Sequence, residues 1–185
     1  MNFGKFSLSS ESNDLKKFEN LDLNDKRIVF YSENQNSMFI FKSLIDELVN
    51  QDITICYVTS SKDDPNLNSN NKKIKTFCIG EGIIRTKFFL NLKTDILVMT
   101  MPDFGTSYIK RSKVHPVHYV YMFHAIASTH LVYKKNAFDN YDSIFCIGDF
   151  QFNEIRTREK LYNLNSKNLI KTGYGHLDNL IEKYS

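Results

Sequence analysis

Short, uninterrupted apolar segments alternate along this chain with longer segments that have helical periodicity. A strand that is apolar on both sides must be covered on both sides, which is the situation of strands in a parallel sheet flanked by helices. We therefore predict an α/β fold, a Rossmann-like parallel sheet flanked by helices. The apolar segments are RIVFYS, ITICYVTS and the stretches at 75–79, 95–100, 118–123, 143–147 and 168–172.

The chain divides into three parts by the composition and pattern of its residues. Residues 1–26 are polar and are predicted to form an N-terminal extension, in which a short helix over 14–24 could present an apolar edge. Residues 27–173 carry the alternating pattern and form the Rossmann-like domain, and residues 174–185 are predicted to be a hinge and terminal helix. Within the domain, the polar stretch 60–73 is expected to be a mobile surface loop on the ligand side.

Composition excludes several classes of protein. A hydrophobic fraction of 42% is too high for a disordered chain, and a net charge of +3 with mixed signs does not suggest a nucleic-acid partner. No apolar run is long enough to cross a bilayer or to act as a secretory signal, so we expect a cytoplasmic protein. The three cysteines, Cys56, Cys78 and Cys146, lie in apolar strand-like segments and are expected to be reduced core residues.

His124 is the leading candidate for a catalytic group. It ends the apolar segment YVYMF and precedes the small residues AIAST. Ligands of open α/β sheets bind beyond the carboxyl ends of the strands, and an imidazole there can accept a proton from a hydroxyl near neutral pH. The alternative, a histidine that only satisfies local structure, stays open from spacing alone. Ser128, Thr129 and His130 could orient His124 or bind phosphate, but a Ser-Thr pair is also a common helix cap.

A second candidate site follows the segment 75–79. IGEGIIRTK leaves a strand and opens a helix, so Gly80 and Gly82 could offer free amide groups to an anion, and Arg85 in the first turn could add its guanidinium. The spacing is not a dinucleotide fingerprint, because Arg85 stands where the third glycine would be. A solvated surface arginine is the alternative for Arg85.

The stretch MTMPDFGTSYIKRS joins the segment 95–100 to a long loop that begins at Pro102. Asp103 and Arg111 in this loop are candidate substrate contacts, although an Asp after Pro is also an ordinary turn residue. No spacing of histidines and carboxylates supports a metal site, so neither a metal nor another cofactor is expected.

Several motifs together resemble the CDP-glycerol glycerophosphotransferase family, the teichoic-acid-type glycerophosphotransferases. They span nearly all of the chain after residue 27, in order. These motifs are YSEN, YVTSSKDDP, MTMPDFG, KRS, YVYMFHAIASTHLVY, AFDNYD, NEIRTRE and KTGYGHLD.

The resemblance implies the N-terminal, acceptor-side domain of a two-domain GT-B transferase. It aligns His124 with the family's base, which activates the acceptor hydroxyl, and Ala125 stands where the family has glycine. The implied acceptor is a cell-surface glycan or a lipid-linked primer, which also implies peripheral contact with the inner face of the cell membrane. The implied donor is CDP-glycerol, bound by a C-terminal domain that this sequence does not contain.

Three functions stay open at this stage. The first is the acceptor-side domain of a transferase that moves glycerol phosphate, or a similar polyol phosphate, from a CDP-activated donor to a hydroxyl. The second is a non-catalytic, truncated or split module that binds the acceptor. The third is a GT-B relative that uses another nucleotide-sugar, since fold alone does not choose chemistry.

Overall fold

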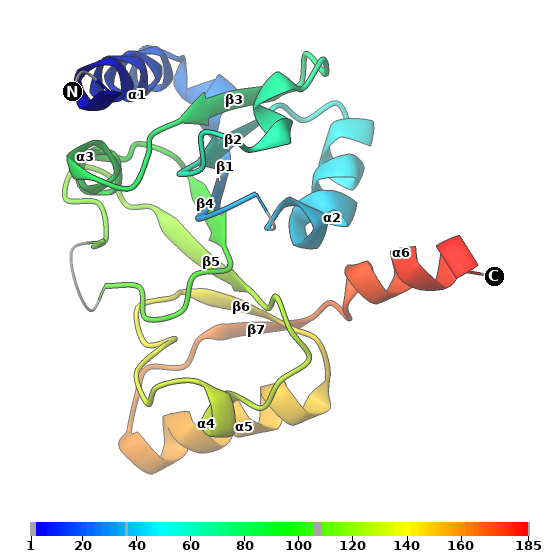
Figure 1. Ribbon diagram of the computed structural model, residues 1–185. Coiled ribbons are helices and arrows are strands. Elements are labelled where there is room, and N and C mark those ends of the chain that lie inside the picture. Colours follow the sequence, from blue (N-terminus) through cyan, green and yellow to red (C-terminus); the bar gives the residue numbers. More distant parts are fainter. Residues whose placement is uncertain (1–2, 36, 106–108, 185) are drawn as a thin grey trace.

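The computed structural model of the protein describes residues 3–35, 37–105 and 109–184. Its centre is a 7-stranded sheet with the order β3-β2-β1-β4-β5-β6-β7, and every neighbouring pair is parallel (Figure 1). The α/β class and the Rossmann-like parallel sheet are thus confirmed. The strands are β1 (Ile28–Ser32), β2 (Ile55–Thr59), β3 (Ile74–Cys78), β4 (Ile96–Met99), β5 (His118–Met122), β6 (Ser143–Cys146) and β7 (Asn168–Lys171).

Helices flank this sheet on both faces (Figure 1). Strands and helices alternate along most of the chain, as the sequence pattern predicts, but η2 stands between β2 and β3, and β5 is the next described element after β4. The helices are α1 (Phe3–Glu19), α2 (Met38–Asn50), α3 (Ile83–Asn91), α4 (Thr129–Val132), α5 (Asp149–Tyr162) and α6 (Gly175–Tyr184), with 3-10 turns η1 (Leu23–Lys26) and η2 (Pro65–Asn68).

Two hydrophobic layers hold the helices to the sheet. Residues alternate between the faces of each strand, so Val29 and Tyr31 of β1 enter the layer shared with α1, α3 and α5, while Phe30 enters the layer shared with α2. The first layer is rich in aromatic rings, among them Phe104 stacked on Tyr119 with 4.7 Å between ring centroids. Burial on both faces explains why the strand segments contain so few polar residues.

Two residues of the segment predicted to be a polar extension, Leu15 and Phe18, belong to this core. The helix predicted over 14–24 runs instead from Phe3 to Glu19, and Leu15 and Phe18 are 1% and 2% exposed. Lys26 fixes the end of α1, since its buried ammonium group donates to the carbonyl oxygens of Phe18 and Glu19 at 3.1 and 2.7 Å. A cation at the carboxyl end of a helix satisfies carbonyls that have no partner within the helix.

The segment 60–73 also differs from the expected mobile loop. It contains η2, and its Asp64 is 2% exposed. The Asp64 carboxylate accepts hydrogen bonds from the Tyr57 hydroxyl at 2.7 Å and from the Asn66 amide at 3.0 Å. A polar composition therefore reflects internal hydrogen bonding here as well as exposure to solvent.

The terminal helix α6 leaves the sheet beside α2 (Figure 1). Its contacts with α2 are small: His176 packs on Phe39 with 4.5 Å between ring centroids, and the Asn179 side chain donates to Ser43 at 3.4 Å. None of the helices within the described ranges is both long and apolar enough to cross a membrane.

Candidate functional site

A cavity of about 510 Å³ opens at the carboxyl edge of the sheet, where the strand order reverses. The chain proceeds from β1 outward to β3 and then returns to β4 on the other side of β1, so the segments that follow β1 and β4 diverge. Open α/β sheets bind ligands in the crevice that this divergence creates. The lining comprises Glu33, Asn34, Ser37, Phe39, Ile40, Thr100, Pro102, Asp103, His124, Val132, Tyr133 and Lys134.

His124 lines this cavity with an exposed side chain. It follows β5 by two residues, so the buried strand delivers it to the carboxyl edge. Its carbonyl oxygen accepts a hydrogen bond from the Tyr174 hydroxyl at 2.9 Å, and its ring lies edge-on to that of Tyr133 at 6.3 Å. The backbone of His124 is thereby anchored while its imidazole remains accessible to a ligand.

Glu33 is the carboxylate that follows the interior strand β1, and it lies half-buried in the cavity wall. Burial raises the pKa of Glu33 above its ordinary value, the Glu81 carboxylate adds to the rise, and the Arg85 guanidinium opposes it. Arg85 also lies beside the Tyr31 hydroxyl, and its buried Nε atom has no hydrogen-bond partner in the described parts of the chain. Arg85 is not among the described residues that line the cavity.

Asp103 lines the cavity from the segment after β4. Its backbone has a φ of 61°, and its amide donates to the Ala137 carbonyl at 3.0 Å, which fixes the turn. Its carboxylate pairs with Lys134, with 3.2 Å between Oδ2 and Nζ. Asp103 and His124 are the two predicted site residues that the structure brings to the same cavity.

The predicted anion site at Gly80 and Gly82 is already occupied in part by the chain's own carboxylates. Gly80 has a φ of 60°, and the Glu11 side chain of α1 covers it so closely that a Cβ there would overlap the carboxyl group. Asp14, also on α1, accepts a hydrogen bond from the Cys78 amide at 3.1 Å. Gly82 remains open to solvent at the start of α3. Two carboxylates beside this corner disfavour a bound phosphate at Gly80.

Ser128, Thr129 and His130 bind Glu154 of α5 instead of orienting His124. The Glu154 carboxylate accepts from the Thr129 amide and hydroxyl at 2.5 and 2.7 Å and from the Ser128 hydroxyl at 2.9 Å, and His130 Nδ1 lies 3.3 Å from it. Partial burial alone would raise the pKa of Glu154, but the hydrogen bonds from Thr129 and Ser128 and the nearby His130 outweigh it and hold the pKa below its ordinary value. The anion at the start of α4 is thus a carboxylate of the protein.

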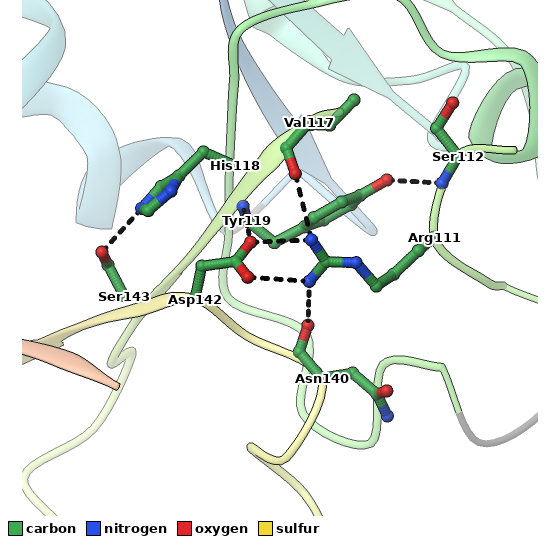
Figure 2. A network of polar contacts seen from close by, with 8 residues as sticks. All are labelled: Arg111, Ser112, Val117, His118, Tyr119, Asn140, Asp142 and Ser143. Carbon is green, nitrogen blue, oxygen red and sulfur yellow. Dashed lines mark hydrogen bonds and ion pairs between the residues drawn. The ribbon is translucent and has the colours of Figure 1, made fainter. Parts of the chain in front are cut away.

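Arg111 lies at the opposite, amino edge of the sheet, which corrects its predicted role as a substrate contact. Its guanidinium donates to both carboxylate oxygens of Asp142 at 3.1 and 2.9 Å, and to the carbonyls of Asn140 and Val117 at 2.8 and 3.1 Å (Figure 2). It also lies over the Tyr119 ring, 4.4 Å from the centroid. The loop after β4 has to return to the amino end of β5, so its later part leaves the candidate site.

The described residues contain no group of three or more His, Cys, Asp or Glu side chains that could hold a metal ion. The three cysteines are unbridged and buried. Burial raises the pKa of Cys56 to about 12 and that of Cys146 to about 11, so neither thiol ionises readily near neutral pH.

Sequence reasoning missed Glu33 and Lys134 as cavity residues. A signal exists for Glu33, because an acidic residue comes directly after the segment RIVFYS, which contains an interior strand of the sheet. None exists for Lys134, which the turn after α4 brings back to Asp103 across 31 residues of sequence.

Comparison with models of protein families gave no match to this sequence, and comparisons with curated proteins and with solved structures also gave none. The candidate site therefore stands on its own geometry and on the sequence motifs.

Proposed function

We propose that the cavity at the carboxyl edge of β1, β4 and β5 is the acceptor site of a transferase. The reaction moves glycerol phosphate, or a similar polyol phosphate, from a CDP-activated donor to a hydroxyl of a surface glycan or lipid-linked primer. The observation that carries the proposal is the accessible imidazole of His124 in a cavity where the strand order reverses. The sequence motifs that resemble glycerophosphotransferases support the choice of reaction.

In this proposal His124 acts as a general base. A ring nitrogen takes the proton of the acceptor hydroxyl while that oxygen bonds to the β-phosphorus of the donor, and the bond from this phosphorus to CMP breaks. The imidazolium then returns its proton to solvent. Tyr174 holds the backbone of His124 in place during this exchange through the hydrogen bond to its carbonyl.

A second candidate function is an acceptor-binding module whose donor site is elsewhere. One observation favours it: Lys134 is the one lysine or arginine in the described cavity lining, and it is already paired with Asp103. A diphosphate needs several cationic or amide donors around it. Under either candidate, the donor's diphosphate is bound by groups outside this cavity.

Titration of the purified chain separates the two candidates. The chain would be mixed with a lipid-free acceptor glycan and with CDP-glycerol labelled in its glycerol, and both binding and label transfer would be measured. Transfer by the chain alone excludes the binding module. Acceptor binding without transfer, restored to transfer when a donor-binding domain is supplied, supports a divided active site. Binding of neither compound at the cavity counts against both candidates.

A further inference from the structure

The cavity has an unusual charge balance for a protein that handles phosphate. Its described lining contains two carboxylates, Glu33 and Asp103, against one ammonium group, Lys134, so its formal charge is −1 when His124 is neutral. Lys134 is paired with Asp103 at 3.2 Å, which leaves Glu33 as the carboxylate that this ammonium does not neutralise. These side-chain charges therefore oppose a dianionic ligand, and the amino end of α2, which reaches the cavity at Ser37 and Phe39, offsets part of that opposition.

Arg85, the cation that opposes the rise in the pKa of Glu33, is not among the described residues that line the cavity. A ligand in the cavity thus meets Glu33, which belongs to the lining, and not Arg85, which does not. A carboxylate accepts hydrogen bonds and donates none, so its natural partners in a ligand are hydroxyl groups.

The remaining lining suits an uncharged ligand with many hydroxyl groups. The hydroxyls of Ser37 and Thr100 lie 3.5 Å apart, and the described residues of the lining include no glycine. Phe39 is 41% exposed and gives the cavity an apolar wall. Polar groups at fixed points beside an aromatic ring are the usual means of binding a sugar ring by its hydroxyls and its apolar face.

We propose that Glu33 is a specificity-determining residue, whose carboxylate binds the hydroxyls of a neutral sugar or polyol end and excludes an end that carries a phosphomonoester. This inference rests on the proposed function, because it takes the cavity to be the acceptor site. It adds to that function a selectivity for neutral acceptor ends, which a general base such as His124 does not provide.

The test measures binding to the isotopically labelled chain by NMR at pH 7.5. The neutral probe is methyl α-glucoside and the charged probe is glycerol 3-phosphate, and the amide signals of Glu33, Thr100 and His124 report on the cavity. The glucoside is expected to shift these signals at a concentration at least about tenfold lower than the phosphate does. Equal or tighter binding of the phosphate at these signals would overturn the inference.

Variants assign the selectivity to Glu33. Glu33→Gln is expected to weaken glucoside binding about tenfold, because a charged hydrogen-bond acceptor is replaced by a neutral amide. The ratio of the affinity for the glucoside to the affinity for glycerol 3-phosphate is expected to fall as well. Asp52→Asn, which removes the same charge at the opposite edge of the sheet, is expected to change neither affinity. Unchanged selectivity in folded Glu33→Gln, or an equal effect of Asp52→Asn, contradicts the role of Glu33.

The test of Glu33 can succeed or fail independently of the test of the transferase, because it measures binding of a probe and not transfer of glycerol phosphate. Selective binding that depends on Glu33, without any glycerol phosphate transfer, supports the role of Glu33 and counts against the transferase. Transfer that depends on His124, with no selectivity for a neutral acceptor end, supports the transferase and overturns the role of Glu33.

Discussion

The carboxylate of Glu11 covers the α-carbon of Gly80 at the turn between β3 and α3, so that a side chain at position 80 would overlap it. Gly80→Ala is expected to lower the free energy of unfolding by about 1–2 kcal/mol, mainly from the strain of a positive φ, with a smaller part from the shift that the Glu11 side chain must make. Urea unfolding measures this loss. Gly82→Ala is the matched control, because a Cβ there meets nothing within 4 Å, and its loss should stay below about 1 kcal/mol.

A double-mutant cycle separates the two causes. Glu11→Ala in the Gly80→Ala background is expected to recover the part of the loss that comes from overlap, while the backbone strain remains. Additive losses in the double variant would show that Glu11 does not cover position 80 in solution.

The two parallel hydrogen bonds from Arg111 to the Asp142 carboxylate predict a structural role for Arg111, which was predicted from the sequence to be a substrate contact. Arg111→Lys is expected to destabilise the protein by about 2 kcal/mol, because a lysine cannot donate to both carboxylate oxygens and to the two carbonyls at once. Urea unfolding gives the loss, and NMR titration with acceptor probes gives the affinity. A folded Arg111→Lys variant with normal stability but impaired acceptor binding would contradict this assignment.

The hydrogen bonds to Glu154 predict a dependence of stability on pH. Because the pKa of Glu154 in the folded protein lies below its ordinary value of about 4.3, its contribution is present above that value and is lost as the pH falls through the folded pKa. Glu154→Gln is therefore expected to cost about 1–2 kcal/mol at pH 7 and less at pH 3.5. An equal cost at both pH values in urea unfolding would refute the proposed contribution.

Glu33 is expected to have the opposite effect on the dependence of stability on pH. Its raised pKa means that the folded protein holds the proton more tightly, so stability declines as the pH rises from the ordinary value through the folded one. Glu33→Gln, a neutral residue of the same shape, is expected to raise the melting temperature relative to the natural protein at pH 8 and to change it little at pH 4. A lower melting temperature at pH 8 would mean that the electrostatic attraction of Arg85 outweighs the effect of burial on Glu33.

The sequence patterns predicted the sheet because strand burial on both faces leaves an unmistakable apolar run, as in IVFYS of β1. They misplaced the bounds of the N-terminal helix, because the apolar residues that fix it to the core in its described part, Leu15 and Phe18, are separated by polar residues and stand near its carboxyl end. The site was harder to predict because its residues meet through loops. The loop after β4 puts Asp103 at one edge of the sheet and Arg111 at the other, and proximity in sequence gives no sign of that separation.

Label transfer by the His124→Gln variant tests the central claim most directly. Transfer of labelled glycerol phosphate from CDP-glycerol to the acceptor glycan would be measured with the purified protein, with His115→Gln, which precedes β5 at the opposite edge of the sheet, as control. The proposed base role predicts a loss of at least about 10²-fold for His124→Gln, with unchanged folding and near-normal transfer by His115→Gln. Near-normal transfer by a folded His124→Gln variant would contradict it.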